Sequence, residues 1–295
     1  MKIIECVPNI SEGWSRKKVL KIAGALTGLP GVKLLDICMD RDHHRSVLTF
    51  IGPPDAVRDA ALAVCGRALE MIDMREHTGA HPRIGTVDVV PFVPLGNATM
   101  PDAVRVAHGF GRAYAEKNRI PIYFYGEAAL APWKRELSDI RRGGYEALRK
   151  KMNDPNWLPD AGPATFHERS GATAVGARVP LIAFNINLKS GDLDLAQSIA
   201  RSIRQSGGGL PCVKALGIPL KSRKLVQVSM NLTDYRVTSV RTVFERVCEE
   251  AARNGTDILE SELIGLIPHA ALAGTTPEDL KLRDFSDKKI LESHF

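Results

Sequence analysis

The feature of this chain that most restricts its fold is one order of apolar segments that occurs twice. The first half runs strand, helix, strand, strand, helix, strand: Lys2–Val7, a helix that Ser15 caps and Gly28 ends, Val32–Cys38, Ser46–Gly52, Ala56–Ile72 and Thr86–Val93. The second half repeats this order: Leu181–Leu188, Leu193–Gln205, Val213–Ile218, Leu225–Leu232, Val240–Ala252 and Thr256–Leu266. It is the split βαβ, or ferredoxin-like, order. The sequence therefore predicts an α+β fold of two ferredoxin-like subdomains, with sheets able to face each other.

The length of the chain favours division into two parts, because 295 residues exceed the usual size of one domain. A further helix at Ala103–Lys117 and a strand at Pro121–Tyr125 extend the first half. We place the boundary just after the Gly- and Ala-rich stretch Gly171–Gly176, which predicts subdomains of residues 1–178 and 179–295. The charged tail after Ala273 is expected to be loosely packed.

The charge of the chain is +6, which raises the question of an anionic partner. Its basic residues are scattered in short clusters such as Lys221–Lys224, and aromatic residues make up only 6%. Nucleic-acid-binding surfaces that stack bases need interleaved basic and aromatic side chains. Small polyanionic metabolites therefore fit this chain better than nucleic acid. No apolar run approaches the roughly 20 residues that cross a bilayer, and no signal peptide is evident, so we expect a cytosolic protein.

Metal and disulfide chemistry find little support in the sequence. The five cysteines are far apart, and no CxxC pair occurs. His77 and His81 are four residues apart, but Gly79 and Pro82 oppose the helix that a zinc-binding pair of this spacing requires. We therefore predict no metal.

Two polar loops are candidate catalytic elements. The first, His77–Gly85, precedes a strand and carries His81 on a Gly-flanked loop, where a histidine suits general acid–base chemistry. The second, Asp40–Arg45, joins two predicted strands at one end of the sheet. In it, Arg45 is a fork for a carboxylate, and His43, His44 or Asp42 can assist proton transfer. A solvated hairpin is the alternative interpretation.

Two further segments are rich in glycine or irregular in pattern. Residues Trp157–Phe166 and Ser170–Thr173 lack any helical or strand period, so they form a long loop of the kind that is often functional. Gly207–Gly209 lacks the spacing of a phosphate-binding loop and is interpreted as a hinge.

Longer strings identify a family. The chain resembles glutamate formimidoyltransferase, the transferase part of formimidoyltransferase-cyclodeaminase, over about residues 2 to 273. Seven ordered strings carry this resemblance: Glu5–Gly13, His77–Leu95, Tyr123–Ala129, Trp157–Arg178, Leu181–Leu188, Leu225–Leu232 and Leu263–Leu272.

The resemblance implies two α/β subdomains around a folate crevice, a homodimer, and a role in histidine degradation with tetrahydrofolate as co-substrate. It implies that His81 is the catalytic histidine, with Arg45 and Arg83 as candidates for the carboxylates of glutamate. The segment that matches the family's folate-binding stretch is Gly162, Pro163, Ala164, Thr165, Phe166, His167, Glu168, Arg169, Ser170 and Gly171.

The chain departs from the family in three places. It lacks the cyclodeaminase half, so a separate cyclodeaminase is expected to take the product. Cys38 stands where relatives carry an acid, so an assisting acid is either missing or supplied by Asp40 or Asp42. His167–Arg169 is more charged than in relatives.

Several alternative functions stay open. One is transfer of a formyl group, in a 5-formyltetrahydrofolate:glutamate formyltransferase. Another is a non-catalytic folate-binding protein, and a third, favoured only by the basic pI, is a nucleic-acid-binding protein.

Overall fold

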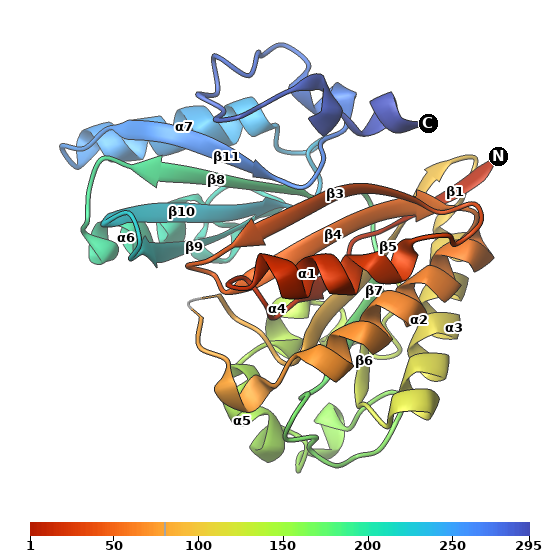
Figure 1. Ribbon diagram of the computed structural model, residues 1–295. Helices are drawn as coiled ribbons and strands as arrows, with labels where there is room; N and C mark the ends of the chain where they lie inside the picture. The colour runs from red at the N-terminus through yellow and green to blue at the C-terminus, as the bar shows by residue number, and fades with distance from the viewer. Residues whose placement is uncertain (80) are drawn as a thin grey trace. The chain divides into compact units, whose positions relative to one another are not determined.

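The computed structural model describes residues 1–79 and 81–295, which form two compact units, Met1–Arg178 and Val179–Phe295 (Figure 1). Ala80, inside the His77–Gly85 loop, lies outside the described residues. Each unit has its own sheet and its own apolar core.

The first unit is built on a seven-stranded sheet. Its strands are β1 (Lys2–Cys6), β2 (Asn9–Ile10), β3 (Lys33–Asp40), β4 (Arg45–Gly52), β5 (Val87–Gly96), β6 (Ile122–Gly126) and β7 (Thr173–Ala177). β1 and β2 both lie between β4 and β5, and β3 pairs with the other edge of β4, all antiparallel. β7 then pairs parallel to β5, and β6 parallel to β7.

Helices cover this sheet. Figure 1 shows α1 (Arg16–Ala23), α2 (Pro54–Met71) and α3 (Met100–Asn118) packed together against it. Their apolar stripes bury Ile22, Val64 and Phe110 in the core together with Ile4 and Phe50 of the strands. Side chains that point to the opposite face, among them those of Val89, Tyr123 and Tyr125, form a smaller apolar cluster with residues of α4 (Leu137–Ile140) and α5 (Gly144–Lys151).

The second unit has a four-stranded antiparallel sheet in the order β11 (Ile258–Ile264), β8 (Ile182–Leu188), β10 (Leu225–Leu232), β9 (Val213–Leu220). Strand alternation directs Phe184, Ile186 and Val228 into a core shared with α6 (Leu193–Ile203) and α7 (Val240–Arg253). Short 3-10 turns are found at Gly24–Leu26, Met74–Glu76, Pro132–Lys134, Pro155–Trp157, Gln205–Gly207, His269–Leu272, Asp287–Lys289 and Leu291–His294.

The predicted fold class is confirmed for both units. Numbered along each repeat, the strands β1, β3, β4, β5 and the strands β8, β9, β10, β11 are both arranged 4-1-3-2, which is the ferredoxin-like order. Within the described residues, no helix is both long and apolar enough to cross a membrane.

One strand was missed and two local predictions were wrong. The Gly- and Ala-rich stretch before residue 178, to which no strand was assigned, contains the fully buried strand β7. The tail is packed, since Leu280 and Leu291 are buried and its backbone bonds to the outer edge of β11 at Ser261. The glycine cluster is a tight turn rather than a hinge, because a Cβ on Gly209 would lie 2.5 Å from the backbone of Ile203.

Candidate functional site

Three loops that are distant in sequence meet at one end of the first sheet. They are the residues between β2 and α1, the hairpin turn between β3 and β4, and the loop that precedes β5. A small pocket where they meet is lined by Ser11, His43, His44, Arg45, His77, His81, Arg83 and Asp88. Both sequence-predicted catalytic loops therefore contribute to one site.

Glycines and one serine permit this close approach. A Cβ on Gly13 would lie 2.1 Å from the carbonyl oxygen of Asp40, and one on Gly79 would lie 2.7 Å from that of His43. Both distances are below any normal contact, so the loops can close only over glycine. The Ser11 hydroxyl donates to the carbonyl of Gly85 at 2.7 Å, which joins the first loop to the third.

His81 is half-buried at the pocket, and both of its ring nitrogens have neighbours. Nδ1 lies 2.8 Å from the carbonyl oxygen of Pro82, and Arg45 Nη1 lies 2.7 and 2.8 Å from the two ring nitrogens. A carbonyl oxygen can only accept, so its bond requires hydrogen on Nδ1. In that tautomer the lone pair of Nε2 faces the guanidinium of Arg45.

The surroundings of His81 keep its imidazole neutral. Burial lowers the pKa of His81 well below its ordinary value, and the positive charges of Arg45 and Arg141 and the nearby His43 lower it further. An unprotonated imidazole has a lone pair that can accept a proton. The site therefore holds a base in its competent form at neutral pH.

Arg45 combines burial with an unused donor. Its Nη2 donates to the Oδ1 of Asn9, whereas its buried Nε has no hydrogen-bond partner among the described residues. Burial and the charge of Arg141 lower the pKa of Arg45 to about 10, so it stays charged at neutral pH. A buried N–H without an acceptor is costly, which is consistent with an anionic ligand that completes the site.

Arg83, the second sequence-predicted carboxylate fork, is already engaged. Its Nη1 and Nη2 donate to the carboxylate of Glu146 at 3.0 and 2.6 Å, and its Nε donates to His77 Nδ1 at 3.1 Å. His77 in turn donates from Nε2 to the carbonyl of His44 at 2.9 Å. Both ring nitrogens of His77 are thus occupied by protein groups, and burial lowers its pKa to about 4.

The hairpin turn is buried rather than solvated at its two histidines. His43 and His44 are 7% and 6% exposed, which excludes the solvated-loop interpretation for both. The His43 ring lies 5.5 Å from that of His81, and Asp40 accepts a hydrogen bond from the backbone N–H of His43 at 2.7 Å. Of the proton-transfer candidates in this turn, His43 is therefore the one whose ring contacts that of His81, in a tilted arrangement.

Two residues of the site, Asp88 and Asn9, were not predicted for it. Asp88 accepts from the backbone N–H of Ile84 at 2.9 Å and forms a buried ion pair with Arg141. Asn9 orients Arg45. A signal for Asp88 did exist, because it interrupts the apolar run of β5, and a charge in a buried strand needs a partner.

Comparisons with known proteins identify the family. A model described as "Formiminotransferase domain, N-terminal subdomain" matches residues 3–178, and one described as "Formiminotransferase domain" matches residues 183–277. The chain belongs to the formiminotransferase domain family. The resemblance predicted from the sequence strings is therefore confirmed.

Its curated relatives include two of similar length. Glutamate formimidoyltransferase of Thermoplasma acidophilum is 43% identical over 99% of this chain and 97% of that protein. The protein of the same name from Streptococcus pyogenes serotype M1 is 40% identical over 99% of this chain and 98% of that protein. Formimidoyltransferase-cyclodeaminase of Gallus gallus is 43% identical over 92% of this chain, which covers 51% of that longer protein.

In this formiminotransferase domain, the segment predicted to bind folate, Gly162–Gly171, lies next to the His81 loop. Thr86 donates its backbone N–H to the carbonyl of Ser170 at 2.9 Å, and Gly85 and Gly171 form a β-bridge. The segment is irregular, as predicted, and its middle residues are exposed or half-buried. The C-terminal end of the segment is therefore bonded to Gly85 and Thr86, the fourth and fifth residues after His81.

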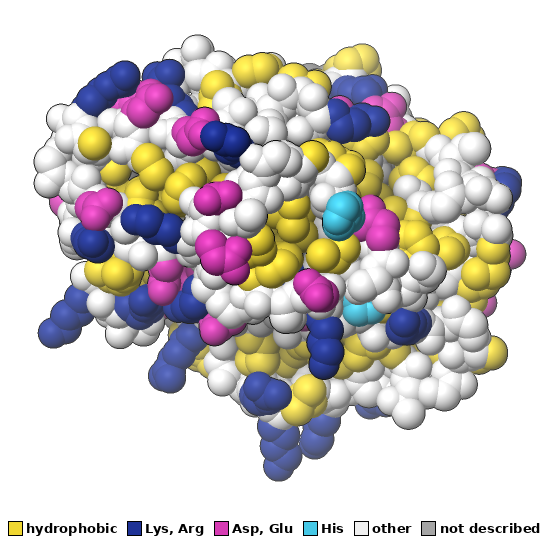
Figure 2. Space-filling view, turned by 90° about the horizontal axis from the view of Figure 1, so that it is seen from above, with side chains coloured by type: hydrophobic (Ala, Val, Ile, Leu, Met, Phe, Trp, Pro, Cys, Tyr) yellow, Lys and Arg dark blue, Asp and Glu magenta, His cyan; other side chains and the backbone are white. Residues whose placement is uncertain are grey.

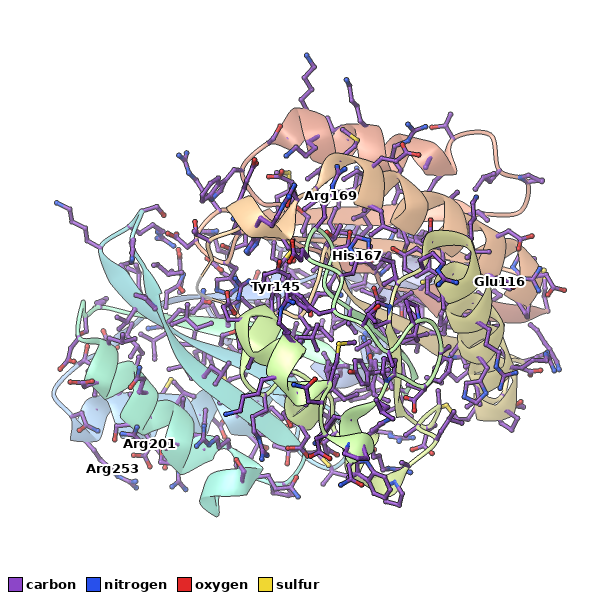
Figure 3. All side chains as sticks on the ribbon, turned by 90° about the horizontal axis from the view of Figure 1, so that it is seen from below. Glu116, Tyr145, His167, Arg169, Arg201 and Arg253 are labelled. Atoms are coloured by element: carbon purple, nitrogen blue, oxygen red, sulfur yellow. The ribbon has the colours of Figure 1, made fainter. Side chains whose placement is uncertain are left out.

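The charged residues of this segment are held by neighbours within the first unit (Figure 3). Tyr145 donates its hydroxyl to the carbonyl of Glu168, and the carboxylate of Glu168 pairs with Arg149 at 2.6 Å. Arg169 donates to the carbonyl of Glu70 at 2.8 Å. These contacts shape the loop, and they leave the ring of Phe166 under the guanidinium of Arg149 at 4.9 Å.

The junction between the two segments predicts a sensitive glycine. Gly171 has φ +65°, and a Cβ there would lie 2.0 Å from the carbonyl oxygen of Ile84. We expect Gly171→Ala to lower the free energy of unfolding by more than about 1 kcal/mol and to raise the KM for folate.

Gly66→Ala is the matched control, because that helical position has nothing within 4 Å of an added Cβ. It should leave stability equal or raise it by roughly 0.4–1 kcal/mol. Denaturant unfolding and initial rates test both variants. A Gly171→Ala protein as stable as the wild type would contradict the tight junction.

Proposed function

We propose that this chain is a glutamate formimidoyltransferase, an enzyme that moves a formimidoyl group between N-formimidoyl-L-glutamate and tetrahydrofolate in histidine degradation. One observation carries the proposal: a neutral His81 contacts a charged, incompletely bonded Arg45 beside the segment proposed to bind folate. Relatives of this name that match almost end to end support it.

His81 is proposed to act as both base and acid. In one direction, the amine of glutamate attacks the formimidoyl carbon on N5 of the folate while His81 accepts the amine proton. A new C–N bond forms and gives a tetrahedral centre. The bond to N5 then breaks as the imidazolium returns the proton to N5. The reverse direction uses the same steps in the opposite order, so one histidine serves both.

Arg45 is the proposed carboxylate-binding residue. Its pocket position places a positive charge next to His81, and guanidinium groups bind carboxylates through paired hydrogen bonds. Arg83 is the less suitable of the two candidates, because Glu146 already occupies its fork. The folate is proposed to lie along Gly162–Gly171, with its reactive N5 towards His81.

The nature of the transferred group requires a direct experiment. The formyl and formimidoyl donors differ only in an oxygen for a nitrogen, so both must be offered to the purified protein with tetrahydrofolate. We expect mass detection to show loss of N-formimidoylglutamate at a rate at least tenfold above that of N-formylglutamate. The reverse ratio would assign formyl transfer, and turnover of neither would favour a non-catalytic folate-binding protein.

The excess of positive charge predicts a preference for polyglutamylated folate. Figure 2 shows lysine and arginine side chains spread among acidic ones on the face in view. The basic side chains that could contact such a tail divide into two groups. Arg141 and Arg223 are paired with Asp88 and Glu260, whereas Lys221 and Lys224 are exposed.

Tetrahydrofolate with five glutamates should therefore bind more tightly than the monoglutamate form at low salt. The difference should narrow as salt rises, because exposed charges are screened beyond about 8 Å at physiological ionic strength. Titrations of both folates at low and high salt measure this. Equal affinities at low salt would remove any role of the basic surface in substrate binding.

Metal ions are not expected to be needed. The reaction uses a proton carrier and a carboxylate anchor, and both nitrogens of His77 are bound to protein groups. We predict full activity after exhaustive chelation. Loss of activity that zinc restores would overturn this expectation.

The family resemblance also bears on the oligomeric state and the location of the protein. We propose a homodimer in the cytoplasm, on the basis of the family resemblance. Sedimentation at several protein concentrations tests the dimer.

A further inference from the structure

We propose that Glu12 and His44 are positioning residues for the loop that carries His81. His44 holds the carbonyl of Thr78, three residues before His81, and Glu12 sets the orientation of the His44 ring. The inference rests on the proposed function only in taking His81 as the acid–base group. It adds residues from the first and second loops of the site to those that control the third.

The His44 ring is fixed by stacking on both of its faces. Trp14 lies on one side, with ring centroids 3.7 Å apart and planes 6° from parallel. His77 lies on the other, at 4.2 Å and 7°. His44 also has φ +49°, a left-handed conformation that few residues adopt without cost. Ring and backbone are therefore both held in one arrangement, and such strain persists only where the surroundings impose it.

The ring bonds directly to the catalytic loop. His44 Nδ1 lies 2.7 Å from the carbonyl oxygen of Thr78, and since that oxygen only accepts, Nδ1 carries the hydrogen. The backbone carbonyl of His44 accepts from His77 Nε2 at 2.9 Å. Side chain and backbone of one residue thus hold both Thr78 and His77, the residues at the start of the loop.

Glu12 faces the remaining nitrogen of that ring. Its Oε1 lies 3.8 Å from His44 Nε2 and accepts from the backbone N–H groups of Trp14 and Ser15 at 2.9 and 3.0 Å. Its Oε2 pairs with Lys18 Nζ at 2.7 Å. Burial alone would raise the pKa of Glu12, but the nearby His44 ring, the ion pair with Lys18 and the hydrogen bonds from the backbone N–H groups lower it below its usual range. The carboxylate is therefore ionised at neutral pH.

A displaced loop would change the chemistry of His81. In its present position the pKa of His81 is lowered by burial and by three nearby groups. These are Arg45 on β4, Arg141 after α4 and His43 of the hairpin turn. The carboxylate of Asp88 on β5 lines the same pocket but is paired with Arg141. If the Thr78 anchor is lost, His81 moves out of this cationic environment into solvent. Its pKa then rises towards its ordinary value of about 6.5.

A pair of substitutions separates the hydrogen bond from the stacking. His44→Asn keeps an N–H donor at the distance of Nδ1 and suits a left-handed backbone. His44→Phe keeps the stack between Trp14 and His77 but has no donor. Glu12→Gln keeps an oxygen for the backbone N–H groups and removes the charge. His108→Phe is the matched control, because His108 Nε2 also lies within hydrogen-bond distance of a carbonyl, that of Ala128 at 2.8 Å, but on α3.

We expect kcat to fall at least 30-fold in His44→Phe and about tenfold in Glu12→Gln, with the KM for folate changed less than threefold. His44→Asn should keep at least a third of the wild-type kcat, and His108→Phe should change only the melting temperature. NMR titration of histidine-labelled protein without substrate should show a raised His81 pKa in His44→Phe, and an unchanged one in His44→Asn and His108→Phe.

The NMR titration does not depend on catalysis, so it distinguishes failure of this inference from failure of the proposed function. If His44→Phe leaves both kcat and the His81 pKa at wild-type values, His44 does not position the loop. If His44→Phe keeps activity while His44→Asn loses it, the stack rather than the hydrogen bond controls the site, and the proposal is overturned. If the His81 pKa is raised in His44→Phe but the wild-type protein shows no turnover, the positioning role of His44 is upheld and the proposed transferase function is refuted.

Discussion

Replacement of His81 by alanine should lower turnover by two or more orders of magnitude while the fold and folate binding persist. A lost general base typically costs a factor of about 10² to 10⁴. His81 is the group that can serve here, since its lowered pKa keeps it neutral and its ring lines the pocket. Its side chain is half-buried and outside the apolar clusters of the unit, so its removal leaves the core intact.

The measurement is kcat for formimidoyl transfer, with folate affinity determined separately by equilibrium titration. His108→Ala is a suitable control for the removal of an imidazole elsewhere in the first unit. A variant that retained more than about a tenth of the wild-type kcat would refute the assignment. His43, whose ring lies 5.5 Å from His81, would then be the next candidate, followed by His44 and Asp42.

The sequence predicted the repeated fold because each repeat satisfies local rules. Alternating apolar residues define β8 and β10, and Ser15 accepts the hydrogen bond of Lys18 N at the start of α1, as its position before an amphipathic stretch indicated. Two such units each need only one sheet and two helices to bury their apolar faces. The strand order follows from this pattern with few alternatives.

β7 was missed because its small residues are required by the side chains of the adjacent strand, and they show no strand periodicity of their own. A Cβ on Gly176 would lie 2.5 Å from the ring of Tyr125 on β6, so the strand must use small residues where the adjacent aromatic ring lies. Without knowledge of that pairing, Gly and Ala indicate a linker. The packed tail escaped prediction for a related reason. Leu280 and Leu291 are buried, but each lies in a short, mostly charged stretch that is too brief to show a helical or strand period.

The candidate site was predictable in its parts but not in its connections. Residue types and glycine-flanked positions marked His81 and Arg45, and the structure brings them into contact. The sequence made Arg83 an equally good candidate for binding a carboxylate, and only the fold shows that Arg83 is already paired with Glu146. Glu12 and Asp88 act through partners more than 30 residues away, which a single sequence does not reveal.

Arg45→Gln should raise the KM for N-formimidoylglutamate by about 10- to 100-fold. This factor corresponds to the roughly 1.5–3 kcal/mol that a hydrogen bond to a charged group contributes. Arg45→Lys should recover only part of it, because lysine keeps the charge but loses the planar fork. Arg83→Gln is the comparison, since a guanidinium already paired with Glu146 has little left to offer a substrate. Equal effects of Arg45→Gln and Arg83→Gln on KM would contradict the assignment of the carboxylate to Arg45.

The same substitution should also shift the pH dependence, and the direction is fixed by charge. Burial comes first among the causes that lower the pKa of His81, and the positive charge of Arg45 comes next. Removing that charge raises the pKa of His81. Because the free base is the active form, kcat/KM of Arg45→Gln should begin to fall at a higher pH than that of the wild type as the solution is acidified. Profiles from pH 4.5 to 8 test this, and an acid limb that stays in place or moves to lower pH would show that Arg45 does not control the basicity of His81.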